Sequence, residues 1–249
     1  MSDSGAGRFR LATAAGDEYD AYHMSRTPGS VKAETHERIV ETAAREIRRH
    51  GYAGASVADV MKQAGLTHGG FYAHFASREA MLEEALDRAA TDSLARLIAA
   101  GQRAEPDGAL DAIAAAYLSD RHVEHPEAGC TLAALGSETA RSSPGLRRVA
   151  TRNVATLIRV LAGHLRGGDD AANRERALAM LAGMVGALTI ARAVDDPALG
   201  KQIRAAVARS ITGTGTGTGA AARGKPRTRA RRGGRVAAAR AATPDTGGD

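Results

Sequence analysis

Six residues between positions 67 and 74 are of types that could contact a nucleic acid: Thr67, His68, Gly69, Gly70, Tyr72 and His74. Hydroxyl and imidazole groups donate hydrogen bonds to phosphate oxygens, and some reach the acceptors on base edges. The glycine pair has no side chains, so it would let the backbone approach a duplex closely, although tolerated small residues would give the same sequence. The spacing predicts a short helix from Thr67 to about His74, with Thr67 as its cap.

The residues before this segment predict the element that positions it. Ser56 has a hydroxyl that can cap free N–H groups, and Asp59 places negative charge in the first turn. Apolar residues follow at helical spacing over 57–64, and Gly65 suits the left-handed backbone of a tight turn. This pattern predicts a helix-turn-helix, whose second helix enters the major groove of DNA. Ser56 is also a candidate phosphate contact, although capping alone explains it.

The segment 67–75, THGGFYAHF, resembles the recognition helix of the tetracycline-repressor (TetR) family, and Ser77-Arg78-Glu79 follows it. The resemblance covers roughly residues 32–90. It implies that Tyr72, His74 and Arg78 contact the phosphate backbone. The glycine pair departs from the family pattern, which often has a larger residue at one of these two positions.

The rest of the chain predicts helices and no strands. We expect an all-α protein in which a three-helix helix-turn-helix head is joined by a long fourth helix to a C-terminal helical bundle. Further helices are expected at about 107–123, 128–141, 145–166, 171–194 and 196–211. Composition divides the chain into a disordered extension, a DNA-binding domain, a helical domain to which the resemblance assigns ligand binding and dimerisation, and a disordered basic tail: 1–30, 31–76, 77–211 and 212–249. Met24 would also make a natural start.

The net charge of +6 lies entirely in the tail. Residues 212–249 contain eight basic and two acidic side chains, whereas residues 1–211 contain 26 of each. Such a tail attracts DNA without reading its sequence, so a DNA-compacting or architectural protein is one alternative, and a solvated extension without a role is another. Residues 24–75 carry a net charge of only +2, so two heads of a homodimer are expected to read a palindromic operator together.

The resemblance also implies a dimer interface and an effector pocket in the C-terminal part. The expected interface residues lie on one apolar helix: Leu181, Met184, Val185 and Leu188. The expected pocket residues, all of which also fit a plain core, are Tyr117, Leu118, His122, Cys130, Leu132, Leu135 and Met180. A small molecule there would move the heads apart and release the operator. Cys130 begins a predicted helix, whose dipole favours a thiolate, so an electrophile-sensing repressor is a further alternative to a small buried hydrophobe.

Other functional classes lack support in the sequence. The cluster of His122, Glu124, His125 and Glu127 matches no zinc spacing, and no glycine-rich phosphate loop follows a strand. We therefore expect no enzyme, no metal site and no cofactor. The sequence has no run of eighteen apolar residues and no secretory signal, and its single cysteine fits a reducing compartment. These features predict a cytoplasmic protein without a membrane partner.

Overall fold

The computed structural model describes residues 28–213. Within this range the chain forms helices and no strands, so the predicted all-α fold is confirmed. The predicted N-terminal extension and basic tail lie almost wholly outside the described residues. At their inner edges, helix α2 begins at Pro28 and helix α10 ends at Thr212.

Four helical elements form the head and its connection to the rest of the chain: α2 (Pro28–Gly54), α3 (Val57–Gln63), the 3₁₀ helix η1 (His68–Ala73) and α4 (Arg78–Gln102). The α-helical backbone of α2 is interrupted at Gly51, with φ of 75° and ψ of 175°. Essentially only glycine adopts this conformation, so Gly51 makes the bend that leads into α3 possible.

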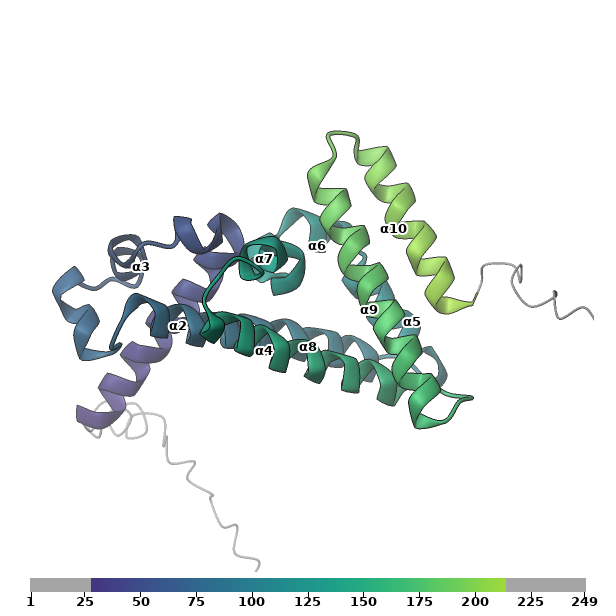
Figure 1. Cartoon of the computed structure of the whole chain (residues 1–249), viewed down its shortest axis with the longest axis horizontal. Coiled ribbons are helices and arrows are strands. Elements are labelled where there is room, and N and C mark those ends of the chain that lie inside the picture. The colour runs from purple at the N-terminus through teal and green to yellow at the C-terminus, as the bar shows by residue number, and fades with distance from the viewer. Residues whose placement is uncertain (1–27, 214–249) are drawn as a thin grey trace, which may run out of the picture. The chain divides into compact units, whose positions relative to one another are not determined.

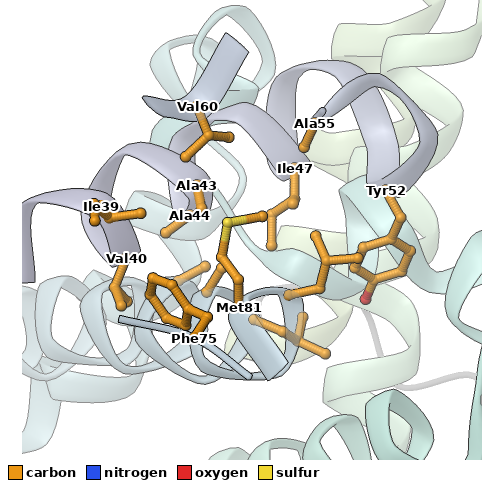
Figure 2. Close-up of a cluster of buried hydrophobic side chains, with 14 of the residues drawn as sticks. Ile39, Val40, Ala43, Ala44, Ile47, Tyr52, Ala55, Val60, Phe75 and Met81 are labelled. Atoms are coloured by element: carbon orange, nitrogen blue, oxygen red, sulfur yellow. The ribbon is translucent and has the colours of Figure 1, made fainter. Parts of the chain in front are cut away.

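The core of the head lies between α2 and the start of α4. Ile39, Val40 and Ile47 project from one face of α2 toward the same interior as Phe75 and Met81 (Figure 2). These side chains are buried, and the helical spacing of the α2 residues is the pattern that the sequence shows. Their packing fixes α2 against α4 and supports the helix-turn-helix.

Eight shorter and longer helices complete the described chain: η2 (Pro106–Gly108), α5 (Ala109–Tyr117), α6 (Asp120–Glu124), η3 (Pro126–Ala128), α7 (Thr131–Thr139), α8 (Pro144–His164), α9 (Asp170–Ala193) and α10 (Pro197–Thr212). Helix α8 runs alongside α4, and α9 and α10 form an antiparallel pair (Figure 1). A second apolar core joins α5, α8 and α9 through Tyr117, Ile113, Ile158, Leu161, Ala177, Met184 and Leu188. Pro144 and Pro197 begin their helices, as the sequence predicts.

The single helix predicted over 107–123 is wrong, because the structure divides it into α5 and α6. The Ser119 side chain accepts a hydrogen bond from the His122 N–H and so caps α6. The Arg204 guanidinium from α10 donates to the carbonyl of Leu118 at the end of α5 and to the Asp120 carboxylate. The division therefore depends on a partner that lies 84 to 86 residues away in the sequence.

By length and composition alone, helix α9 could cross a membrane, since an 18-residue window within it has a mean hydropathy of 1.3. The core helix of a water-soluble protein meets the same measure. Ala177, Met184 and Leu188 of α9 are buried within the chain's own core. The absence of a membrane partner stays a prediction.

Candidate nucleic-acid interface

Hydrogen bonds at both ends of α3 hold the helix-turn-helix in place. The Ser56 Oγ accepts a hydrogen bond from the Asp59 N–H at 3.1 Å and donates one to Asp59 Oδ2 at 2.6 Å. At the other end, Arg38 Nε of α2 donates to the Ala64 carbonyl oxygen at 3.1 Å. Gly65 then forms the predicted turn with φ of 72°. The capping role of Ser56 is confirmed, and its hydroxyl is committed to this role in the free protein.

The predicted recognition helix forms, but as the 3₁₀ helix η1 rather than as an α-helix. Its two glycines disfavour α-helical structure, since glycine costs about 1 kcal/mol relative to alanine in a helix interior. Thr67 occupies the N-cap position, but its side chain makes no capping hydrogen bond, which corrects the prediction of a hydroxyl cap. Phe71 and Phe75 are buried with ring centroids 5.4 Å apart, so they anchor η1 to the head as expected.

The residues of η1 that are not anchored face solvent. Thr67, His68 and Gly69 are exposed, and Tyr72 is 73% exposed despite its size. A Cβ added to Gly69 would meet nothing within 4 Å, and one added to Gly70 would make only ordinary contacts. Neither glycine has a positive φ. The fold of the head therefore does not require glycine at either position.

Of the two further residues predicted to contact phosphates, Arg78 has hydrogen-bond partners within the chain, whereas the buried Nδ1 of His74 has none among residues 28–213. The Arg78 guanidinium donates to the carbonyl oxygens of Tyr52 and Ala55, the latter at 3.2 Å, and so ties α4 to the connection between α2 and α3. His74 is half-buried, and desolvation, together with the charges of His36 and Lys32, lowers its pKa. A neutral imidazole is therefore favoured near pH 7, so a phosphate contact from His74 would be a hydrogen bond rather than an ion pair.

Lys62 is a candidate that the sequence interpretation missed. It is exposed in the last turn of α3, beside the turn that leads to η1. Lysine ammonium groups at such positions neutralise phosphate charge. Its place on the outer face of α3, opposite the buried Val60 and Met61, was the available signal.

A pocket of about 320 Å³ lies between α4, α7 and α8, with Tyr117 at the end of α5 also lining it. Three of the residues predicted for an effector pocket line it, namely Tyr117, Cys130 and Leu132, and its role as an effector site stays a prediction. His122 lines a neighbouring cleft, and Leu118 and Met180 are core residues outside the lining. Leu135 is also misplaced by the prediction, because it packs in the core of the head. The sequence interpretation missed the contributions of α4 and α8, among them Leu97, Asn153 and Leu157.

Beside this pocket, the His122 ring connects the end of α5 to the start of α7 through hydrogen bonds. Its Nδ1 lies 2.6 Å from the Tyr117 carbonyl oxygen, and its Nε2 accepts a hydrogen bond from the Cys130 N–H at 2.9 Å. Burial lowers the pKa of His122 to about 4, so the ring is neutral, with its proton on Nδ1. Within residues 28–213, no group of three or more His, Cys, Asp or Glu side chains is placed to hold a metal ion.

Helix α7 connects the pocket to the head. Cys130, Thr131 and Leu132 at its start line the pocket, and Glu138 and Thr139 at its end contact the head. The Tyr52 N–H donates to Glu138 Oε2 at 2.8 Å, and the Tyr52 hydroxyl lies 2.9 Å from Thr139 Oγ1. A Cβ at Gly51 would lie 2.5 Å from Glu138 Oε1, so glycine also makes this close contact possible.

A buried arginine of α2 adds a second link between the head and the segment that leads into α7. Arg48 of α2 donates to the carbonyl oxygens of Ala89 in α4 at 3.2 Å and of Gly129, just before α7, at 3.3 Å. Burial, followed by the nearby charge of Arg96, lowers the pKa of Arg48 to about 10. The guanidinium still carries its charge at pH 7, so its hydrogen bonds to these carbonyls are charge-assisted.

Two family models match the chain, and together they cover more than half of it. "Bacterial regulatory proteins, tetR family" matches residues 39–85, and "Transcriptional regulator LmrA/YxaF-like, C-terminal domain" matches residues 106–205. The chain belongs to the TetR family. It is a DNA-binding transcriptional regulator, and the helix-turn-helix described above is its DNA-binding element.

Solved structures of TetR-family regulators share this fold. A regulator from Cytophaga hutchinsonii is 22% identical, with a TM-score of 0.65 over 76% of this chain and 98% of that one. A regulator from Chloroflexus aurantiacus is 25% identical, with a TM-score of 0.61 over 73% and 96% of the two chains. No curated protein matches the chain.

Most of the residues predicted for a dimer interface lie inside the chain's own core. Leu181, Met184 and Leu188 are buried there, so they offer little surface to a partner, and the interface itself stays a prediction. Val185 is half-buried and lies on the outer face of α9, the face that also carries Leu178, Ala182, Gly186 and Thr189. The sequence shows that α9 is apolar on more than one side, but it does not show which side its own chain covers.

Proposed function

We propose that this TetR regulator is a cytoplasmic homodimeric repressor that binds a palindromic operator and leaves it when a small molecule fills the pocket. The observation that carries this proposal is the position of α7. Its first turn lines the pocket, and its last turn holds the head through Glu138 and Thr139.

A ligand in the pocket would act on the head through this helix. Helix α7 has nine residues, so its two ends are about 13 Å apart, and a short helix moves largely as one body. A molecule that fits the pocket better when α7 is displaced would favour the displaced state by its difference in affinity. Displacement of Glu138 would then shift Tyr52 and the head, and the spacing of two heads on one operator would change.

The outer face of α9 supports a two-fold interface. Leu178, Ala182, Val185, Gly186 and Thr189 recur at helical spacing on this face, and all are exposed or half-buried. Leu199 of the neighbouring α10 is 42% exposed. Small and apolar residues on one helical face suit close packing against the same face of a second copy, as a two-fold interface requires.

Leu132→Trp tests the link between pocket and head without any ligand. The indole should fill part of the pocket at the first turn of α7 and imitate an effector, so operator affinity should fall by roughly five- to 150-fold, the usual range of allosteric coupling. Fluorescence anisotropy with a labelled operator duplex measures this affinity. Circular dichroism and sedimentation check that the variant stays folded and dimeric.

Ala115→Trp is the matched control, because Ala115 is exposed on α5 and the added ring does not enter the pocket. It should bind the operator as the unchanged protein does. A folded, dimeric Leu132→Trp protein with unchanged operator affinity would show that the pocket does not control the head.

Two alternative functions depend on the arginine-rich tail and on Cys130. The arginine-rich tail lies outside the described residues, so an architectural role for it stays a prediction. Cys130 is 5% exposed and lines the pocket, so an electrophile would reach its thiol through that space. Sensing through Cys130 likewise stays a prediction.

A further inference from the structure

The pocket has an apolar wall that limits what it can hold. Its volume of about 320 Å³ is at the lower end of the range for small-molecule sites. Large apolar side chains from three helices contribute to the wall: Leu94, Leu97, Leu132, Val154 and Leu157. Burial of a ligand against this wall favours a compact molecule with an apolar body.

Two polar groups in the pocket lack hydrogen-bond partners among residues 28–213. The Tyr117 hydroxyl and the Asn153 Nδ2 are both buried without a partner of suitable geometry. Burial, with a contribution from Cys130, raises the pKa of Tyr117 well above its usual value, so the phenol keeps its proton and can donate it. A buried donor without an acceptor is unfavourable, and a ligand oxygen would satisfy it.

The charged residues of the pocket are not in its interior. Asp87 and Arg152 are exposed, and both also line the neighbouring cleft toward α2. The buried polar residues of the lining, such as Ser93, Tyr117 and Thr131, are uncharged. The half-buried Arg192 guanidinium acts on Tyr117 and Cys130 from outside the lining. A charged ligand would therefore find no ion-pair partner in the interior lining of the pocket, and an unpaired buried charge is strongly disfavoured.

We propose that the pocket takes an uncharged, largely apolar molecule with a carbonyl oxygen, which accepts hydrogen bonds from the Tyr117 hydroxyl and the Asn153 Nδ2. This inference rests on the proposed function, in which the same pocket holds the effector. It specifies the chemistry of that effector: a ketone, ester or related neutral carbonyl compound rather than a carboxylate, an amine or a plain hydrocarbon.

Three size-matched probes separate these classes with the full-length protein. Benzophenone has the carbonyl acceptor, diphenylmethane lacks it, and 4-benzoylbenzoate adds a negative charge. Isothermal titration calorimetry should give an affinity for benzophenone more than roughly tenfold higher than for diphenylmethane, because each of the two hydrogen bonds to a buried donor contributes about tenfold. The benzoate should bind more weakly than the ketone.

Tyr117→Phe removes the hydroxyl and keeps the ring. It should lower the affinity for benzophenone roughly tenfold and leave that for diphenylmethane unchanged, so the preference for the carbonyl falls to the part that the Asn153 amide supplies. The free variant should be about as stable as the parent, because the hydroxyl makes no hydrogen bond of good geometry and loses only a weak interaction with the Cys130 thiol. Tyr72→Phe makes the same chemical change on the exposed surface of η1 and should keep the preference.

Each other outcome overturns the proposal. Equal affinities for benzophenone and diphenylmethane, no binding of either, or an unchanged preference in Tyr117→Phe would show that the pocket does not select a neutral carbonyl compound. Operator release is measured separately by anisotropy. If benzophenone binds through Tyr117 but the operator stays bound, the ligand chemistry holds and the proposed release mechanism fails.

Discussion

Gly69→Leu is expected to weaken operator binding thirtyfold or more while leaving the head at least as stable as before. The stability expectation follows from the open space around Gly69 and from its ordinary φ, since leucine favours helical backbone more than glycine does. The binding expectation follows from the exposed position of Gly69 on η1. A leucine there would hold the backbone away from the groove.

The size of this effect reflects two heads per operator. A good contact to a base pair contributes about 1–3 kcal/mol, so its loss in both heads costs about 2–6 kcal/mol. Anisotropy with the operator duplex gives the affinity, and chemical denaturation gives the free energy of unfolding. Gly163→Leu is the control, because Gly163 is exposed in α8 with open space around it. Wild-type affinity in Gly69→Leu would show that the glycine is merely tolerated.

The double substitution Ala182→Glu and Gly186→Glu is expected to separate the dimer and to abolish operator binding at concentrations that saturate the unchanged protein. Both positions lie on the outer face of α9, and a Cβ at Gly186 meets nothing within 4 Å in the protomer. A two-fold interface would bring four carboxylates together. Loss of the second head removes an avidity of about 10²–10⁴-fold.

Analytical ultracentrifugation measures the oligomeric state, and anisotropy measures operator binding in the same samples. Ala115→Glu adds one carboxylate on the exposed surface of α5 and should leave both unchanged. A double variant that remains dimeric would place the interface elsewhere. One that becomes a folded monomer yet binds the operator normally would contradict the need for two heads.

The local parts of this fold were predictable from the sequence. The stripe of Ile39, Val40 and Ile47, the cap at Ser56 and the turn at Gly65 each act within a few residues. Their patterns therefore predicted the helix-turn-helix and the anchoring of η1 by aromatic residues. The solvent-exposed positions of His68 and Tyr72 follow from the same local periodicity.

Several failures of prediction share a cause, which is a partner far away in the sequence. Arg204 and Ser119 divide α5 from α6, and no local pattern shows that an arginine of α10 reaches Leu118. Leu135 belongs to the head because α7 packs against α2. The pocket needs Asn153 from α8, whose unpartnered amide becomes visible only after the helices are packed.

The contact between Glu138 and the Tyr52 N–H was also beyond prediction. A glutamate on a helix is ordinarily a solvated surface residue, and only the bend at Gly51 turns this N–H toward it. The connection between pocket and head therefore depends on long-range contacts, whereas the DNA-reading surface depends on local ones.

Selection of bound duplexes from a random DNA pool by the full-length protein shows whether paired helix-turn-helix heads read the DNA sequence. We expect enrichment of a sequence with two inverted half-sites, as two heads related by a two-fold axis would read them. Binding without any enriched sequence, with affinity set by salt alone, would contradict it. That result would indicate that the arginine-rich tail, rather than the helix-turn-helix, governs the interaction with DNA.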